Sequence, residues 1–120
     1  MITPEIKKEL LELGLDVDRQ IERFFDSEET FRKFFRKFFV SSEDVVKELE
    51  RAISIGERGL IEAHAHALKS IAGNIGFDGV FEPAQKIVND MRAGVNGDAV
   101  SDLTRIRWAY DTAKSICEKL

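Results

Sequence analysis

The chain has 120 residues, a formal net charge of −4 and a single cysteine. This length is enough for one hydrophobic core but not for two, so we predict a single domain over residues 1–120. One cysteine excludes an internal disulfide and a zinc site built on cysteine pairs. The acidic balance argues against a nucleic acid partner. No apolar run is long enough for a membrane span, and the N-terminus does not resemble a secretory signal, so we expect a cytoplasmic protein with no membrane partner.

Apolar residues recur at helical spacing along nearly the whole chain, and no stretch alternates as a strand would. Thr3 and Pro4 suit the start of a first helix, Ser42 suits an N-cap, and Gly76 suits a left-handed C-cap. The expected helices cover residues 3–13, 17–25, 28–40, 42–56, 57–75, 79–93 and 98–119. Short connections make successive helices antiparallel neighbours. We therefore predict an all-α fold: an up-down-up-down four-helix bundle with short additional N-terminal helices.

The two histidines of the chain, His64 and His66, lie together in the second long helix. With Leu68 at the centre of the buried face, His66 lies about 160° away, on the solvent side, and His64 only about 40° away. Residues two apart on a helix do not share a face, so this pair cannot chelate one metal ion. His66 is the histidine that the helical pattern leaves accessible.

The neighbours of His66 on the helix surface are Lys69 and Ser70, one turn on, and Gly73, two turns on. Ser70 and Gly73 are small, which leaves room for another protein to approach the imidazole. Lys69 places a positive charge beside a ring that would gain about two negative charges on accepting a phosphoryl group. A surface histidine beside a surface lysine would show the same residues without any function, so both interpretations stay open at this point.

Residues 65–76, with the sequence AHALKSIAGNIG, resemble the signature of histidine phosphotransfer (HPt) domains, roughly A-H-x-L-K-G-x-A-x-x-x-G. In this resemblance His66 is the phosphoacceptor and Lys69 the supporting lysine. Ala72 takes the small core position, and Gly76 is the glycine that ends the helix. The resemblance extends over essentially the whole chain and implies the same helical bundle.

Two positions depart from the family pattern. Ser70 stands where the family usually has glycine, and it is small enough to keep close docking possible. Val88 stands where family members often carry a Gln or Glu that hydrogen-bonds near the phosphohistidine. Gln85, one turn earlier, is the candidate for that role.

The resemblance implies a phosphocarrier without catalytic turnover of its own. His66 would take a phosphoryl group from the aspartate of one response-regulator receiver domain and pass it to another. The implied partners are such receivers and a sensor or hybrid histidine kinase. No cofactor is expected on this chain, because Mg²⁺ would be brought by the receiver. Met1 and a near-complete bundle lead us to expect a free-standing protein.

The segment 31–39 offers a different interpretation. Its aromatic residues form one stripe and its basic residues the other; the aromatic residues are Phe31, Phe34, Phe35, Phe38 and Phe39. Such a helix is typical of membrane-surface or calmodulin-binding segments. We favour a helix that closes the bundle core with its aromatic stripe. Its basic side could also steer an acidic receiver.

Two further hypotheses keep the fold and change the function. The chain could be a phosphotransfer-inactive module that binds a kinase or receiver as an adaptor or inhibitor, and Ser70 and Val88 favour that hypothesis. A purely structural bundle would make the motif around His66 an accident, and we favour it least. Cys117 lies on the apolar stripe of the last helix, where we expect it to serve packing rather than redox chemistry.

Overall fold

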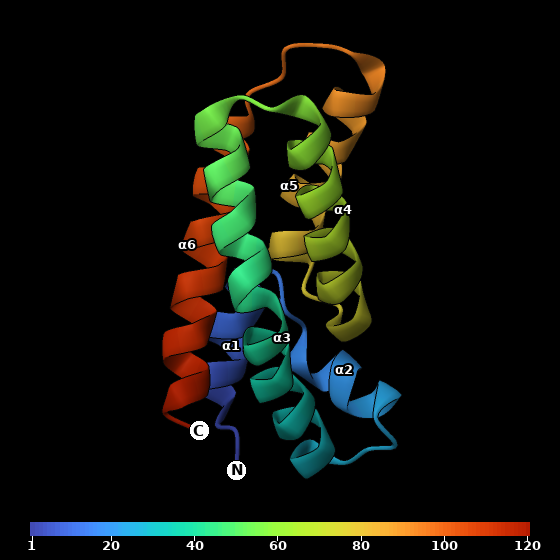
Figure 1. Ribbon diagram of the computed structural model, residues 1–120. Helices are drawn as coiled ribbons and strands as arrows, with labels where there is room; N and C mark the ends of the chain where they lie inside the picture. The colour runs from blue at the N-terminus through green and yellow to red at the C-terminus, as the bar shows by residue number, and fades with distance from the viewer.

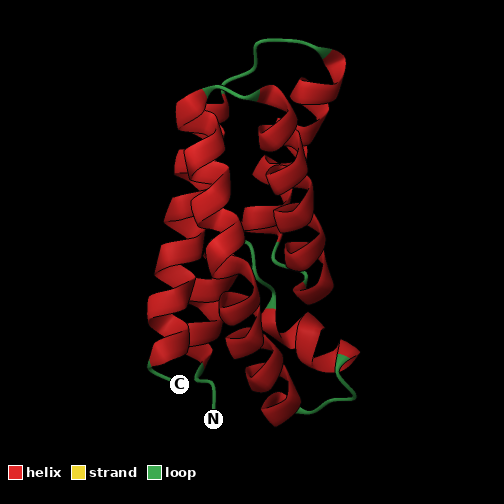
Figure 2. Ribbon diagram, in the orientation of Figure 1, coloured by secondary structure: helices red, strands yellow, loops and turns green.

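The computed structural model describes residues 1–120, which form six α-helices and no strand (Figures 1 and 2). The helices are α1 (Pro4–Glu12), α2 (Val17–Arg23), α3 (Glu28–Ile55), α4 (Arg58–Ile75), α5 (Asp78–Ala93) and α6 (Ala99–Glu118). The long helices α3 to α6 form a bundle in which each contacts the next and α3 also contacts α6. Figure 1 shows successive long helices running in opposite directions. The predicted helical bundle is confirmed. No helix combines the length and the apolar content that crossing a membrane requires.

The predicted helices at 28–40 and 42–56 are one continuous helix, α3, and the prediction of a break at Ser42 was wrong. No glycine or proline lies between Glu28 and Ile55, so nothing in the backbone interrupts the helix. Ser42 is buried inside α3, and its hydroxyl donates to the carbonyl oxygen of Phe38 at 2.6 Å. This bond to the preceding turn satisfies a serine within a helix as well as an N-cap would. The helix ends at Gly56, which has a left-handed φ of +79°.

The two short N-terminal helices pack at the end of the bundle where α4 ends and α5 begins (Figure 1). Here the turn after α1 crosses the turn after α4, and the Asp78 N–H donates to the carbonyl oxygen of Gly14 at 2.8 Å. The crossing requires a glycine in each of the two segments. Gly14 has a φ of +91°, and a Cβ on Gly79 would overlap the carbonyl oxygen of Leu13. This backbone contact fixes the C-terminal end of α4 in place.

Aromatic side chains on the N-terminal half of α3 form a cluster in the core. Phe31, Phe35, Phe38 and Phe39 are buried, whereas Phe34 is 44% exposed. Phe38 and Phe39 both pack against Tyr110 of α6, with ring centroids 5.8 and 5.1 Å apart. The burial of these rings leaves little of the stripe for a membrane surface. It supports the interpretation that the stripe closes the core.

The hydroxyl of Tyr110 is the polar group at the centre of this aromatic core. It lies 2.9 Å from the Ser42 hydroxyl and 3.4 Å from the carbonyl oxygen of Phe39. Since Ser42 donates its own proton to Phe38, we assign Tyr110 as the donor to Ser42. Burial raises the pKa of Tyr110, so the hydroxyl stays protonated and able to donate.

A charged pair joins α5 and α6 on another side of the bundle. Asp102 is 4% exposed, and its carboxylate lies 3.1 Å from the ammonium group of Lys86. Lys86 also pairs with Asp90 on its own helix at 3.0 Å. Hydrogen bonds to Asp90 and Asp102 raise the pKa of Lys86, so this lysine remains charged beside the buried carboxylate.

The C-terminal end of α6 packs against the N-terminal half of α3. Cys117 is buried there, and burial raises the pKa of its thiol, partly offset by the nearby cations Arg36 and Arg32. The guanidinium group of Arg32 also donates to the carbonyl oxygen of Leu120. A buried, protonated thiol is a packing group, as the sequence pattern indicated.

We expect Ser42→Ala to lower the free energy of unfolding more than Tyr110→Phe does. Ser42→Ala leaves the buried Tyr110 hydroxyl with only the 3.4 Å contact to Phe39, at a cost of about 1–3 kcal/mol. Tyr110→Phe leaves Ser42 bonded to Phe38 and should cost about 0.5–1.5 kcal/mol. Urea unfolding followed by circular dichroism measures both. Equal losses, or a larger loss for Tyr110→Phe, would contradict this account of the core.

Candidate functional site

Helix α4 is held at both ends by local capping interactions. At its start, the carboxylate of Glu57 accepts a hydrogen bond from the Leu60 N–H at 2.8 Å. At its end, Gly76 adopts a left-handed φ of +69°, and its N–H bonds to the carbonyl oxygens of Ala72 and Gly73. The predicted role of Gly76 as the C-cap is therefore correct. These caps set the length of the helix that carries both histidines.

One stripe of α4 faces the core and fixes the rotation of the helix. The stripe consists of Ile61, Ala65, Leu68, Ala72 and Ile75, each no more than 5% exposed. His66 is exposed on the opposite side, and His64 is half-buried at the edge of the stripe. Side chains of His, Cys, Asp and Glu do not gather in threes anywhere in the fold to form a metal site. The helix therefore presents one accessible imidazole, that of His66.

Lys69 and Ser70 follow His66 by three and four residues within the helix α4, a spacing that places both next to it on the helix surface. The Ser70 hydroxyl donates to the backbone carbonyl oxygen of His66 at 3.1 Å, so in this arrangement it is bonded to its own helix. Lys69 is half-buried and forms none of the ion pairs in the structure. Its ammonium group is therefore free to meet a negative charge near His66.

Helix α5 lies next to the site and contacts α4 near Gly73. A Cβ on Gly73 would lie 3.4 Å from the Phe81 ring, so α4 and α5 are closely packed at this level. Because the two helices are antiparallel, seven residues back along α4 and seven forward along α5 place Val88 level with His66. Val88 is fully buried and offers no polar atom. Gln85, one turn nearer Phe81 on α5, is half-buried and carries the polar amide that we expect to act in place of Val88.

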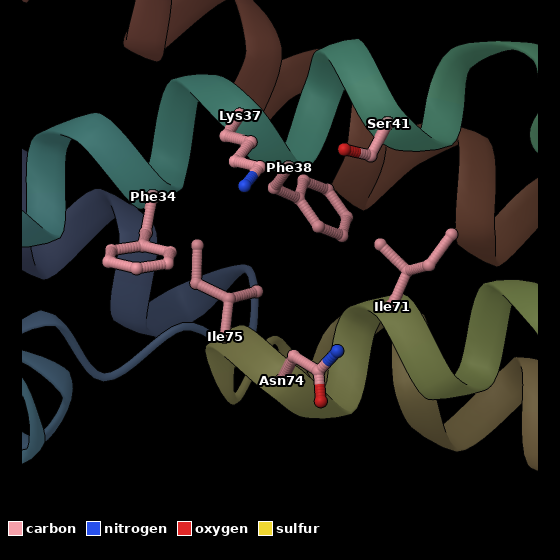
Figure 3. A pocket seen from close by; sticks show the side chains of 7 residues that line it. All are labelled: Phe34, Lys37, Phe38, Ser41, Ile71, Asn74 and Ile75. Carbon is pink, nitrogen blue, oxygen red and sulfur yellow. The ribbon is translucent and has the colours of Figure 1, made fainter.

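A groove between α3 and α4 lies beside the site, and the sequence did not point to it. Its volume is about 240 Å³. Figure 3 shows side chains of both helices around it. The lining residues are Phe34, Lys37, Phe38 and Ser41 of α3 and Ile71, Asn74 and Ile75 of α4. The pattern of residues within α3 did not show that α4 would form the other wall of a groove. The absence of acidic residues from both segments was the available signal.

A comparison with protein-family models finds one match, described as Hpt domain, over residues 33–115. The matched segment begins in α3, includes α4 and α5 entirely, and ends near the C-terminal end of α6. It therefore contains the bundle and the histidine helix. Neither a search of curated proteins nor a search of solved structures finds a match.

We expect diethyl pyrocarbonate to modify His66 several-fold faster than His64. The reagent needs an accessible ring nitrogen, and His66 is exposed whereas His64 is half-buried. Peptide mass spectrometry over a time course resolves the two positions. In urea the two rates should converge, which serves as the control. Equal rates in the folded protein would contradict the orientation of α4.

Proposed function

The chain belongs to the Hpt domain family, and from this premise we propose that it is a phosphotransfer protein whose phosphoacceptor is His66. Membership of this family implies a part in a two-component phosphorelay, as a phosphocarrier module rather than a catalyst. One observation supports the specific role most directly. The matched segment contains one exposed histidine, and it lies in the middle of a bundle helix with small residues beside it.

The proposed chemistry is a reversible exchange between His66 and a receiver aspartate. A neutral ring nitrogen uses its lone pair to form a bond to phosphorus while the bond between phosphorus and the aspartate oxygen breaks. The carboxylate leaves with the bonding electrons, and the other ring nitrogen keeps its proton. Handing the group to a second receiver reverses these steps. Such transfers depend mainly on alignment and on cations near the phosphoryl oxygens.

The residues around His66 support this exchange by charge and by size. We propose that Lys69, which has no partner in the structure, offsets the negative charge of the phosphoryl group. Ser70 and Gly73 have small side chains, so a receiver can approach the ring closely. Gln85 would reach the edge of the site from α5. The receiver would contribute Mg²⁺, and this chain would bind no cofactor of its own.

A second candidate function keeps the partners and drops the transfer. The chain would then be an adaptor or inhibitor that binds a receiver or kinase without accepting a phosphoryl group. Two observations favour it: Val88 is buried and apolar where the family often has a polar residue, and the Ser70 hydroxyl is bonded to the backbone. The exposed His66 beside an unpaired Lys69 favours the phosphocarrier.

We expect wild-type protein to gain an acid-labile phosphoryl adduct when incubated with phosphoramidate or with a phosphorylated receiver, and His66→Gln to gain none. Glutamine keeps the size and polarity of the side chain but offers no nucleophilic ring nitrogen. Intact-mass spectrometry before and after acid treatment detects the adduct.

His64→Gln is the matched control and should be labelled like the wild type. If His66→Gln is labelled as readily as the wild type, the assignment of His66 is wrong. If no protein is labelled but receivers still bind, the adaptor function holds instead.

Lys69→Ala should slow transfer from a phosphorylated receiver about three- to tenfold, as expected for one partly solvated charge contact. Lys69→Arg keeps the charge and should retain most of the rate. Quench-flow transfer kinetics measure the effect, and thermal unfolding of both variants should match the wild type because Lys69 forms no ion pair. An unchanged rate for Lys69→Ala would remove this residue from the site.

A further inference from the structure

The surface around the groove between α3 and α4 contains no carboxylate from either helix. Residues 30–42 of α3 and 64–75 of α4 include none of the 22 acidic residues of the chain. The charged residues of these segments are all basic: Arg32, Lys33, Arg36 and Lys37 in the first, and Lys69 in the second. In a protein of net charge −4, this absence concentrates positive charge beside the histidine helix.

The structure divides the four cations of residues 30–42 between two sides of α3. Arg32 and Arg36 lie toward α6, near Cys117. Lys37 lines the groove toward α4, and Lys33, one turn earlier, shares its flank. Neither lysine takes part in an ion pair of the structure. Both ammonium groups on the groove side are therefore available to a partner.

The groove itself combines an apolar interior with a cationic edge. Figure 3 shows Lys37 extending from α3 into the space between the helices, at the end where Ile75 lies. Phe38 is buried at its inner wall, and Phe34, stacked on Phe24 at 4.7 Å, keeps 44% of its surface exposed. An apolar side chain of a partner inserted here would contact mostly hydrocarbon. The residues that flank it in the partner would lie near Lys37.

The groove is continuous with the surface around His66. Ser70 and Asn74 follow His66 by four and eight residues, so Asn74 lies about 12 Å further along α4. Asn74 lines the groove toward α3, whereas Gly73, which is exposed, lies beside Phe81 of α5 and does not line the groove. A partner protein bound over His66 can therefore also contact the groove, across the surface formed by Ser70 and Asn74.

We propose that this groove, with Lys37 and Lys33 at its edge, is a specificity surface for the receiver domain. It would seat an apolar side chain of the receiver that is flanked by carboxylates, while the receiver aspartate lies over His66. The inference rests on the proposed function of His66 and adds the surface by which one receiver is preferred over another.

Charge complementarity selects this occupant. Cations without internal partners attract carboxylates over a distance and raise the rate of encounter. An interior lined by Phe38, Ile71 and Ile75 favours hydrocarbon over polar groups. A membrane surface fits less well, because the groove is concave and most of the neighbouring phenylalanines are buried.

The test compares transfer rates of charge variants at several salt concentrations. Receiver domains from the genome that encodes this chain are phosphorylated with acetyl phosphate, and those that transfer to the wild type serve as probes. We expect Lys37→Glu to lower the second-order rate about three- to tenfold at an ionic strength of about 0.05 M, and the difference to shrink at about 0.5 M. Asn74→Trp, which fills the groove mouth, should slow transfer at both salt concentrations.

The matched control is Lys8→Glu, an exposed lysine of α1 that forms no ion pair and whose reversal changes the net charge equally. It should transfer at the wild-type rate. All variants should accept a phosphoryl group from phosphoramidate equally, because that small donor needs no docking surface.

The outcomes separate the inference from the proposed function. The inference fails if Lys37→Glu transfers at the wild-type rate in low salt, or if Lys8→Glu is slowed equally, which would show an effect of net charge alone. The proposed function fails, and the inference with it, if neither phosphoramidate nor any receiver labels His66 of the wild type. Slower labelling of Lys37→Glu by phosphoramidate would place Lys37 in the chemistry of His66 and overturn its role in docking.

Discussion

The burial of one stripe of α4 is the constraint on which the proposed site depends. Ala65, Leu68 and Ala72 are fully buried, so α4 cannot rotate about its axis without exposing hydrocarbon. A rotation of one residue, about 100°, would also drive the polar imidazole of His66 toward the core. The small size of the two alanines lets neighbouring helices approach closely. The exposure of His66 is therefore a consequence of core packing, and it needs no interaction at the imidazole itself.

Helix α3 supplies both the core and the surface beside the site. Its N-terminal half buries an aromatic stripe, and the bond between Ser42 and Tyr110 satisfies the polar groups inside that stripe. Because the helix continues unbroken past Ser42, the orientation of its buried residues also fixes the direction of Lys37. Two separate helices joined at residue 41 would have let these two halves turn independently. The continuity of α3 thus couples the aromatic core to the shape of the groove.

The helical fold, the cap at Gly76 and the orientation of His66 could all be predicted, because each depends on local spacing within one helix. The division of α3 could not, since a serine that bonds to the preceding turn has the same local sequence as an N-cap. The partners of His66 on α5 depend on the register between two helices. Spacing within the chain indicated that Val88 lies opposite His66, but it could not show that Val88 is fully buried. The groove was missed for the same reason: its walls come from two helices.

The two flanks of His66 differ in a way that bears on how a phosphocarrier serves several partners. On the α5 flank, Gly73 lies close to the Phe81 ring, and neither residue lines a pocket. On the α3 flank, Asn74 opens into the groove. A carrier that exchanges with different receivers in turn must offer each of them the same imidazole, so the chemistry at His66 cannot distinguish them. Discrimination then requires contacts away from the ring, and only differences in affinity for such contacts separate one receiver from another. In this fold the α3 flank is the side that can hold them.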